Sequence, residues 1–128
     1  MNNEMLKFVE NDRFARFIGI KLITVEPGYA IAKIEITENH FNGLNLVQGG
    51  VIFTLADYAF AAASNSKGFA TVSINTNISF LKTPRSRILT AEAKEISSSK
   101  SICLYNIDVF DEDNTIIANL SSTGFIKR

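Results

Sequence analysis

The chain has 128 residues, 46% of them hydrophobic, and its formal net charge at pH 7 is zero. A chain of this length forms one domain with a sizeable core. The balanced charge argues against a nucleic-acid-binding protein, and the hydrophobic content argues against a disordered one.

Cysteine usage and the N-terminal residues bear on location. Cys103 is the only cysteine, which excludes an internal disulfide and fits a reducing compartment. The first twelve residues mix charged and apolar side chains and lack the continuous apolar segment of a secretory signal. We therefore expect a cytoplasmic protein. With only two prolines and no low-complexity run, we expect residues 1–128 to form a single domain.

The first third of the chain predicts a helical lead-in and a hairpin. Residues 1–18 carry apolar side chains at helical spacing, and Asn11 or Asp12 is expected to cap the second of two short helices. Residues 20–26 and 29–36 have strand patterns. Pro27 and Gly28 between them suit the two central positions of a type II turn.

The central stretch, residues 51–66, predicts one helix that is apolar on all sides. Alanine and leucine dominate it, and no proline or glycine interrupts it. A helix without a polar face belongs in a core, and this one is too short to span a bilayer. Its single charge, Asp57, needs an explanation.

The second half of the chain predicts strands at residues 71–81, 88–96, 102–110 and 116–126. The first alternates almost perfectly, and one face is expected to comprise Val72, Ile74, Thr76, Ile78 and Phe80. Strands joined by short turns pair antiparallel, because parallel neighbours need a longer crossover. The expected fold is α+β, with an antiparallel sheet of five or six strands wrapped around the long helix. Since one sheet cannot cover every side of a helix, we expect dimerisation to complete the burial.

The motif around this helix resembles that of a known family. Asn42-Gly43, Gln48-Gly49-Gly50 and Leu55-Ala56-Asp57 are similar to the signature of hotdog-fold acyl-CoA thioesterases of the phenylacetate-degradation type. That signature is Asn-x-x-Gly-x-x-His-Gly-Gly followed by a helix with Leu-x-Asp-x-Ala. The chain departs from it twice: Asn45 stands at the glycine of Asn-x-x-Gly, or else the loop relies on Gly43 instead, and Gln48 stands at the histidine. Gln donates and accepts hydrogen bonds but carries no proton near neutral pH.

The resemblance assigns the catalytic roles. Gly49 and Gly50 begin the helix, where unpaired N–H groups and the helix dipole favour negative charge, and the resemblance makes the Gly49 N–H the oxyanion donor. Asp57 would be the base or nucleophile, working opposite the glycine of a partner subunit. The alternatives are a tight turn at Gly49 and a structural Asp57 that hydrogen-bonds a neighbouring loop or chain.

The remaining candidates have weaker support from the sequence. Asn42 would orient water or the carboxylate, or would only shape the loop. Gln48 would hold the thioester or the loop, or would cap the helix. His40 is expected to be a surface or loop residue, because no Gly-x-Ser-x-Gly motif or partner acid suggests a triad. The expected substrate-binding residues are Gly50, Tyr58, Asn75, Lys82 and Arg85.

The resemblance implies a homo-oligomer, dimeric or a dimer of dimers, that hydrolyses an aryl- or medium-chain acyl-CoA to the free acid and CoA. It implies no cofactor and no metal, and we expect no nucleic-acid or membrane partner. The alternative is a non-catalytic hotdog domain that binds or senses acyl-CoA. A hotdog dehydratase is less favoured, because no histidine stands at the start of the helix.

Overall fold

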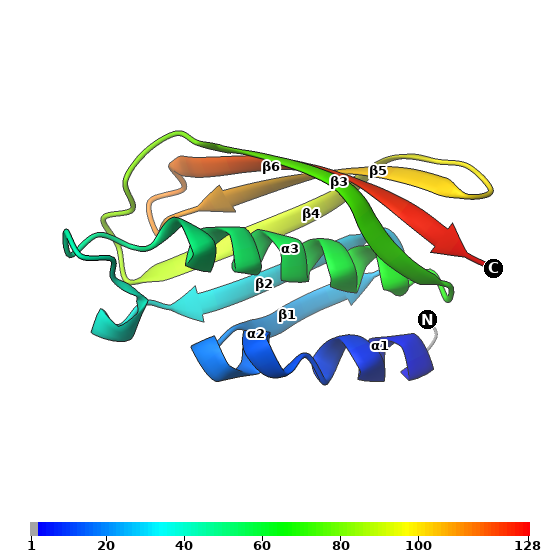
Figure 1. Ribbon diagram of the computed structural model, residues 1–128, viewed down its shortest axis with the longest axis horizontal. Helices are drawn as coiled ribbons and strands as arrows, with labels where there is room; N and C mark the ends of the chain where they lie inside the picture. Colours follow the sequence, from blue (N-terminus) through cyan, green and yellow to red (C-terminus); the bar gives the residue numbers. More distant parts are fainter. Residues whose placement is uncertain (1–2) are drawn as a thin grey trace.

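The computed structural model describes residues 3–128, arranged as one sheet with helices against it (Figure 1). Residues 1 and 2 of the expected lead-in lie outside this range. The helices are α1 (Asn3–Glu10), α2 (Arg13–Ile18), the 3-10 helix η1 (Glu38–His40) and α3 (Gly49–Asn65). The strands are β1 (Lys21–Glu26), β2 (Tyr29–Glu35), β3 (Ala70–Phe80), β4 (Ile88–Ser98), β5 (Ile102–Phe110) and β6 (Ile116–Lys127).

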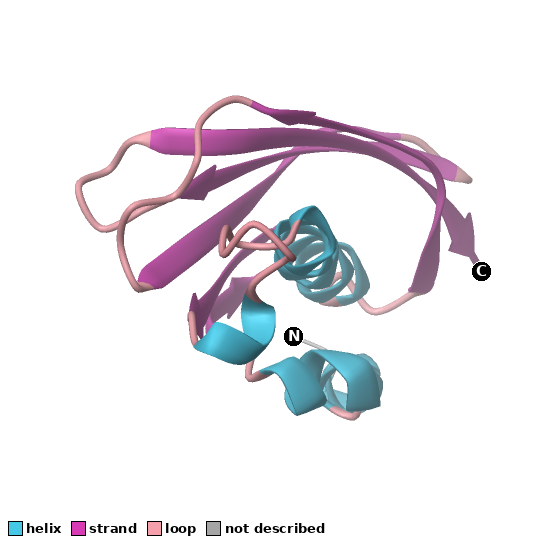
Figure 2. Cartoon of the chain, turned by 60° about the vertical axis from the view of Figure 1, so that its left-hand side comes forward, coloured by secondary structure: helices cyan, strands magenta, loops and turns pink. Residues whose placement is uncertain are grey.

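The six strands form one antiparallel sheet in the order β1-β2-β4-β5-β6-β3. The sheet curls around α3, and α1 and α2 lie below that helix (Figure 2). This arrangement confirms the α+β prediction and the hotdog architecture. The strand order adds that β3 crosses to the far edge and pairs with β6, so one side of β3 has no neighbouring strand.

Helix α3 fills the concave side of the sheet because its sheet-facing residues are small or apolar. Leu55, Ala56, Ala59, Ala62 and Ala63 are completely buried. The alanines let the strands approach closely, and larger rings fill the remaining space. For example, the ring of Phe60 packs edge-on against Tyr105 of β5, with ring centroids 5.3 Å apart. The helix begins two residues before the predicted start, at Gly49.

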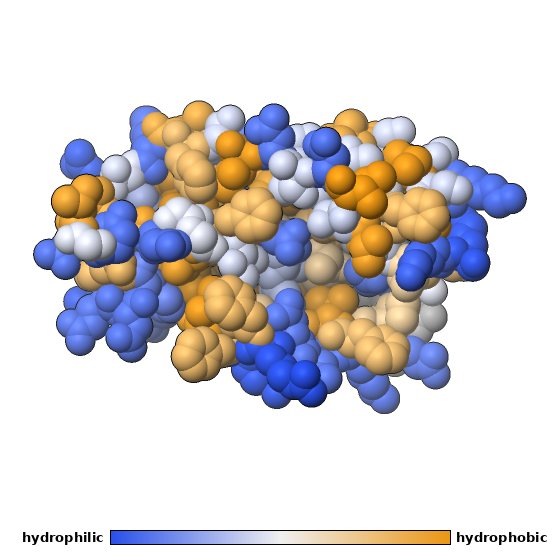
Figure 3. All heavy atoms as spheres, in the orientation of Figure 1, coloured by the Kyte–Doolittle hydropathy of each residue, from blue (hydrophilic) through white to orange (hydrophobic). Residues whose placement is uncertain are grey.

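The opposite side of α3 is only partly covered. Phe53, Thr54 and Asp57 are half-buried, and Figure 3 shows apolar side chains exposed over α3 and β3. The expected all-round burial is therefore incomplete within one chain. An apolar helix side left half-open is typical of a surface that another molecule covers.

The predicted alternation along β3 is wrong in its first half. A β-bulge between Ser73 and Asn75 adds a residue to the strand and reverses which side chains face the core. Val72 and Ile74 are 49% and 58% exposed, whereas Thr71 is buried. The sequence does not reveal such a bulge. The apolar and polar residues still alternate regularly, but after the bulge the odd and even positions have exchanged the faces of the sheet that they point to.

The predicted turn and cap are confirmed. Gly28 has a φ of 76°, as the second central residue of a type II turn requires. The Asp12 side chain caps α2 by accepting a hydrogen bond from the Ala15 N–H at 2.9 Å. Asp12 also lies close enough to α3 for its negative charge to raise the pKa of Asp57.

Candidate active site

The loop before α3 is a small hairpin organised by Asn42. Its side-chain oxygen accepts hydrogen bonds from the Leu44 N–H at 2.9 Å and the Leu46 N–H at 3.1 Å. Asn45 in the same loop has a φ of 60°. Asparagine is among the few non-glycine residues that tolerate this conformation, which explains how Asn45 replaces the glycine of the family motif.

The N-terminus of α3 presents one unpaired amide. The Gln48 side-chain oxygen accepts a hydrogen bond from the Gly50 N–H and so caps the helix. Among residues 3–128, the Gly49 N–H has no hydrogen-bond partner, as expected for the first residue of a helix. The ring of Phe80 closes one side of this amide, since a Cβ on Gly49 would lie 3.2 Å from it.

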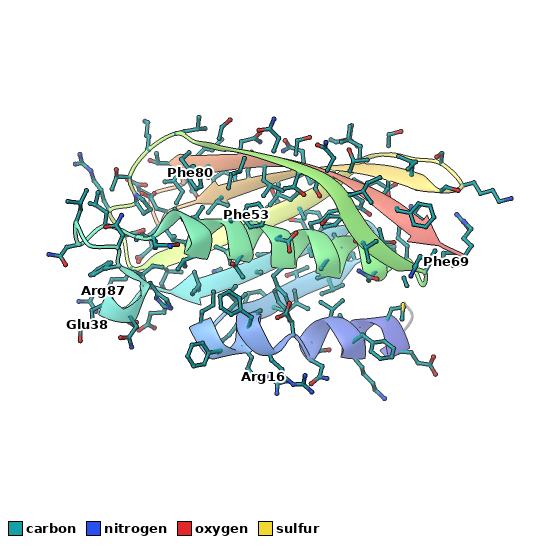
Figure 4. All side chains as sticks on the ribbon, in the orientation of Figure 1. Arg16, Glu38, Phe53, Phe69, Phe80 and Arg87 are labelled. Carbon is teal, nitrogen blue, oxygen red and sulfur yellow. The ribbon has the colours of Figure 1, made fainter. Side chains whose placement is uncertain are left out.

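Phe80 was not among the residues predicted for the site. It ends β3, is 54% exposed, and lies over the N-terminal half of α3, whereas Phe69 lies at the other end of that strand (Figure 4). Its position against Gly49 depends on the crossing of β3 over the helix. No local sequence pattern indicates this crossing.

Asp57 lies two turns further along α3, half-buried on the open side of the helix. Burial raises the pKa of its carboxyl group, and the charge of Asp12 raises it further. Among the described residues, no hydrogen bond or ion pair holds this carboxylate. An unpaired, partly desolvated carboxylate costs stability and is common where it abstracts a proton or attacks an electrophile.

Gly49 and Asp57 of one chain cannot meet at one reacting carbon. Eight residues separate them along α3, which corresponds to about 12 Å at 1.5 Å per residue. Reacting groups must approach to roughly 3–3.5 Å. Within one chain, these two groups are therefore too far apart to act on the same carbonyl carbon.

Two neighbouring hollows lie at this end of α3, and the first of them borders Gly49. A cavity of about 330 Å³ is lined by Asn42, Gly49, Phe80 and Lys82 among others, which brings a cation beside the unpaired amide. A second cavity of about 530 Å³ lies across the loop and contains Arg85 and Arg87. Glu38 also lines the second cavity, and Figure 4 shows it near Arg87 at this end of the molecule.

The other expected substrate-binding residues are not gathered at Gly49. Tyr58 is buried toward the lead-in helices, where burial and the charge of Asp12 raise the pKa of its hydroxyl. Asn75 is exposed on the convex side of the sheet, because its neighbour Thr76 faces inward and contacts Ser122 at 3.1 Å. A role for Tyr58 or Asn75 in substrate binding stays a prediction.

His40 lies in the connection between β2 and α3, but the expectation that it could be a surface residue is wrong. Its side chain is only 6% exposed, and both ring nitrogens lie within hydrogen-bond distance of main-chain atoms. Its sequence context, Thr37-x-x-His40, has the spacing of a capping box with histidine in the place of glutamate or glutamine. This spacing was the one sequence feature that could have predicted the contact between His40 and the Thr37 N–H.

Within residues 3–128, no group of three or more His, Cys, Asp and Glu side chains is placed to hold a metal ion. No helix in the same range is long and apolar enough to cross a membrane. The polar groups described above along α3 are the Gly49 amide, the Asp57 carboxylate and the Gln48 carboxamide, with Lys82 lining the adjacent cavity. Together they suit the activation of a carbonyl group in an anionic substrate.

Known proteins share this fold and sequence. The model of the thioesterase superfamily matches residues 44–118. Acyl-coenzyme A thioesterase PaaI of Escherichia coli is 34% identical over 110 residues, covering 85% of this chain and 79% of that protein. The solved structure of E. coli PaaI, from the phenylacetic acid degradation operon, superposes with a TM-score of 0.92 at 30% identity and covers 98% of this chain and 92% of that one.

Two further matches extend the comparison. The 1,4-dihydroxy-2-naphthoyl-CoA hydrolase of Listeria monocytogenes is 28% identical over 114 residues, 87% of this chain and 93% of that protein. A hypothetical thioesterase of Streptococcus pneumoniae, solved with coenzyme A, has a TM-score of 0.88 at 19% identity, which shows a shared fold; the match covers 95% of this chain and 96% of that one.

The fold and the sequence match therefore define a hotdog-fold enzyme of the thioester hydrolase class. The chain belongs to the thioesterase superfamily, and within it to the acyl-CoA thioesterases that resemble PaaI.

Proposed function

We propose that this enzyme hydrolyses an aryl- or medium-chain acyl-CoA to the free acid and CoA at a site shared by two copies of the chain. One observation carries the proposal: the Gly49 amide and the Asp57 carboxylate have no hydrogen-bond partner among the described residues. We assign the amide to one copy and the carboxylate to the other. Each is chemically suited to one half of thioester hydrolysis. The separation of about 12 Å along α3 keeps them from acting together within one chain.

The Gly49 N–H donates a hydrogen bond to the thioester carbonyl, and the bond strengthens as the oxygen becomes negative. Gln48 assists, because its side-chain oxygen is already held by the Gly50 N–H. That bond turns the carboxamide so that its NH₂ group is left to donate. In this way the residue that replaces the family histidine supplies a hydrogen bond without carrying a proton.

Asp57 supplies the other half of the reaction. Its carboxylate takes a proton from water as the water oxygen attacks the carbonyl carbon; the carbon–sulfur bond then breaks, and the departing CoA thiolate takes up the proton. Alternatively, the carboxylate attacks the carbonyl carbon directly and the carbon–sulfur bond breaks. Water then hydrolyses the acyl–Asp57 anhydride at the Asp57 carbonyl, and a proton from that water goes to the departing CoA thiolate. A single turnover in heavy-oxygen water distinguishes the routes, because only the direct route places the label in Asp57.

The open edge of β3 supports the pairing of two copies. Two strands related by a two-fold axis run antiparallel, so β3 of one copy can continue the sheet of another. This contact would cover Val72 and Ile74, which are exposed although apolar, and the half-open side of α3. A dimer of dimers would be a further step and would need a second contact surface.

The basic residues of the 81–87 segment support a CoA substrate. Lys82 lines the cavity beside Gly49, and Arg85 lines the neighbouring one. Phosphate groups pair well with both residue types, and Arg adds a two-pronged hydrogen bond. The coenzyme A found with the S. pneumoniae protein of this fold is consistent with that assignment.

Release of free thiol from a panel of acyl-CoAs tests the proposal, with Asp57→Asn as the decisive variant. We expect kcat to fall by about 100-fold or more while acyl-CoA still binds, since the interaction is made in the transition state. Glu26→Gln is the control, because it removes an exposed carboxylate at the opposite end of α3. Binding without thiol release in the native protein would instead establish a sensor domain, the alternative favoured by Gln48 in place of the family histidine.

A further inference from the structure

His40, the single histidine of the chain, lies at the junction of three segments that are separate in sequence. Its Nδ1 accepts a hydrogen bond from the Thr37 N–H at 2.9 Å, and its Nε2 lies 2.7 Å from the carbonyl oxygen of Ile18. Ile18 ends α2, while Thr37 precedes η1. The imidazole thus links the lead-in helices to the loop that precedes α3.

These two partners define the state of the ring. An N–H group only donates, so Nδ1 must be unprotonated; a carbonyl only accepts, so Nε2 must carry the proton. The neutral Nε2–H tautomer is therefore the one form that satisfies both contacts. In this form the ring caps two short helical segments at once, the last carbonyl of α2 and the first turn of η1.

The main chain of His40 extends this link to the start of α3. Its carbonyl oxygen accepts a hydrogen bond from the Gln48 N–H at 2.8 Å, and the next rung joins the Asn42 N–H to the Leu46 oxygen at 2.7 Å. Phe41 and Val47 form the bridge between these rungs. Residues 40–48 are therefore a short hairpin with His40 and Gln48 at its base.

We propose that His40 is a positioning residue for hydrolysis: its imidazole fixes the base of the 40–48 hairpin and thereby the direction of the Gly49 N–H. This inference rests on the function proposed above for Gly49. The path runs from the His40 ring to its own backbone, across one hydrogen bond to Gln48, and through one peptide bond to Gly49. No step in it requires His40 to touch the substrate.

Simple core filling does not account for this arrangement. An apolar side chain would fill the same buried space without the cost of desolvating two ring nitrogens. Histidine instead holds two main-chain groups that its neighbours leave unpaired. A displacement of about 1 Å at a catalytic group can cost up to about 100-fold in rate, so the precision of this hairpin matters for turnover.

Two conservative variants separate the two contacts. His40→Asn keeps an acceptor near the position of Nδ1, and His40→Gln keeps a donor near that of Nε2. His40→Phe fills the space and removes both. We expect kcat to fall by about 10-fold or more in His40→Phe with little change in KM, and to recover in part with each amide variant. Rates are measured well below the melting temperature of each variant.

Ser66→Ala is the matched control. Its buried hydroxyl also lies within hydrogen-bond distance of two main-chain carbonyls, those of Glu26 at 2.8 Å and Ala63 at 2.7 Å, but at the opposite end of α3. We expect it to lower the melting temperature and leave kcat unchanged. A His40→Phe protein that is less stable but turns over at the native rate would overturn the proposal.

Nitrogen NMR of the free protein provides a readout that needs no enzymatic activity. We expect the Nε2–H tautomer in the native protein, and amide shifts at Gln48 and Gly49 that change in His40→Phe but not in Ser66→Ala. The opposite tautomer, or unchanged amide shifts, would overturn the positioning role. Absence of thiol release with the expected NMR result would reject the proposed function instead and leave the link to Gly49 established.

Discussion

The two ends of α3 carry similar small polar residues but differ in how fully those residues are paired. At the C-terminal end, the Asn65 side chain donates to the Ala61 and Thr71 carbonyls and accepts from the Thr71 N–H. Glu95 nearby accepts from Lys67 at 2.7 Å and from the Tyr105 hydroxyl at 3.0 Å.

The N-terminal half of α3 leaves two polar groups unpaired. The Gly49 N–H and the Asp57 carboxylate have no partner among residues 3–128, and Gln48 is exposed. Since unpaired polar groups cost stability, they persist where another molecule pairs them. The contrast shows that polar groups are fully paired at the C-terminal end, and it is consistent with our proposal that the N-terminal half meets substrate and a second copy.

Removing the Gly49 N–H is the most direct test of this difference between the two ends of α3. Gly49→Pro deletes the donor at the first helical position, where proline is well tolerated. Gln48 already has φ −67° and ψ 134°, the extended conformation that a residue before proline prefers. We expect kcat to fall by about 10²–10³-fold, the loss typical of one oxyanion donor.

Gly49→Ala is the control for this variant, because it adds the same Cβ toward Phe80 but keeps the N–H. Circular dichroism should show α3 intact in both proteins. If Gly49→Pro turns over as fast as Gly49→Ala, the Gly49 amide is not the oxyanion donor.

Mixing two inactive variants tests whether the site spans two copies. A dimer with one Asp57→Asn chain and one Gly49→Pro chain has one site with both groups intact and one with both lost. Random assembly from equal amounts should therefore restore about a quarter of native activity in a two-fold dimer. Thiol release is measured after co-refolding. A mixture no more active than its components would show that both groups act within one chain or not at all.

Local features of the site were predictable, whereas long-range contacts were not. The long apolar helix, the lone charge of Asp57 and the Asp12 cap follow from residue type and spacing, although the helix begins two residues before its predicted start. Asn45 at positive φ also fits a local rule. His40 was misjudged because one of its partners, Ile18, lies 22 residues away. Phe80 reaches Gly49 only because β3 crosses to the far edge of the sheet.

Asp57 should also affect stability, with a smaller effect. Its pKa is raised in the folded protein, so the ionised form is disfavoured there and lowers stability at pH values above the folded pKa. Asp57→Asn should therefore raise the melting temperature at neutral pH. The gain should shrink as pH falls through the folded pKa and vanish below the ordinary value of 3.8. A pH-independent change in melting temperature would contradict this sign.

The smallest effect is expected at the paired end of α3. Tyr105 is 1% exposed, and its hydroxyl donates to Glu95, so Tyr105→Phe removes one hydrogen bond while Lys67 still pairs with the carboxylate. We expect a loss of about 0.5–1.5 kcal/mol in the free energy of unfolding. Chemical denaturation measures it, and kcat should stay at the native value because the contact lies beyond the last turn of α3. A fall in kcat without a matching loss of stability would mean that the C-terminal end also affects the reaction. The proposed separation between a structural C-terminal end and a functional N-terminal half of α3 would then be wrong.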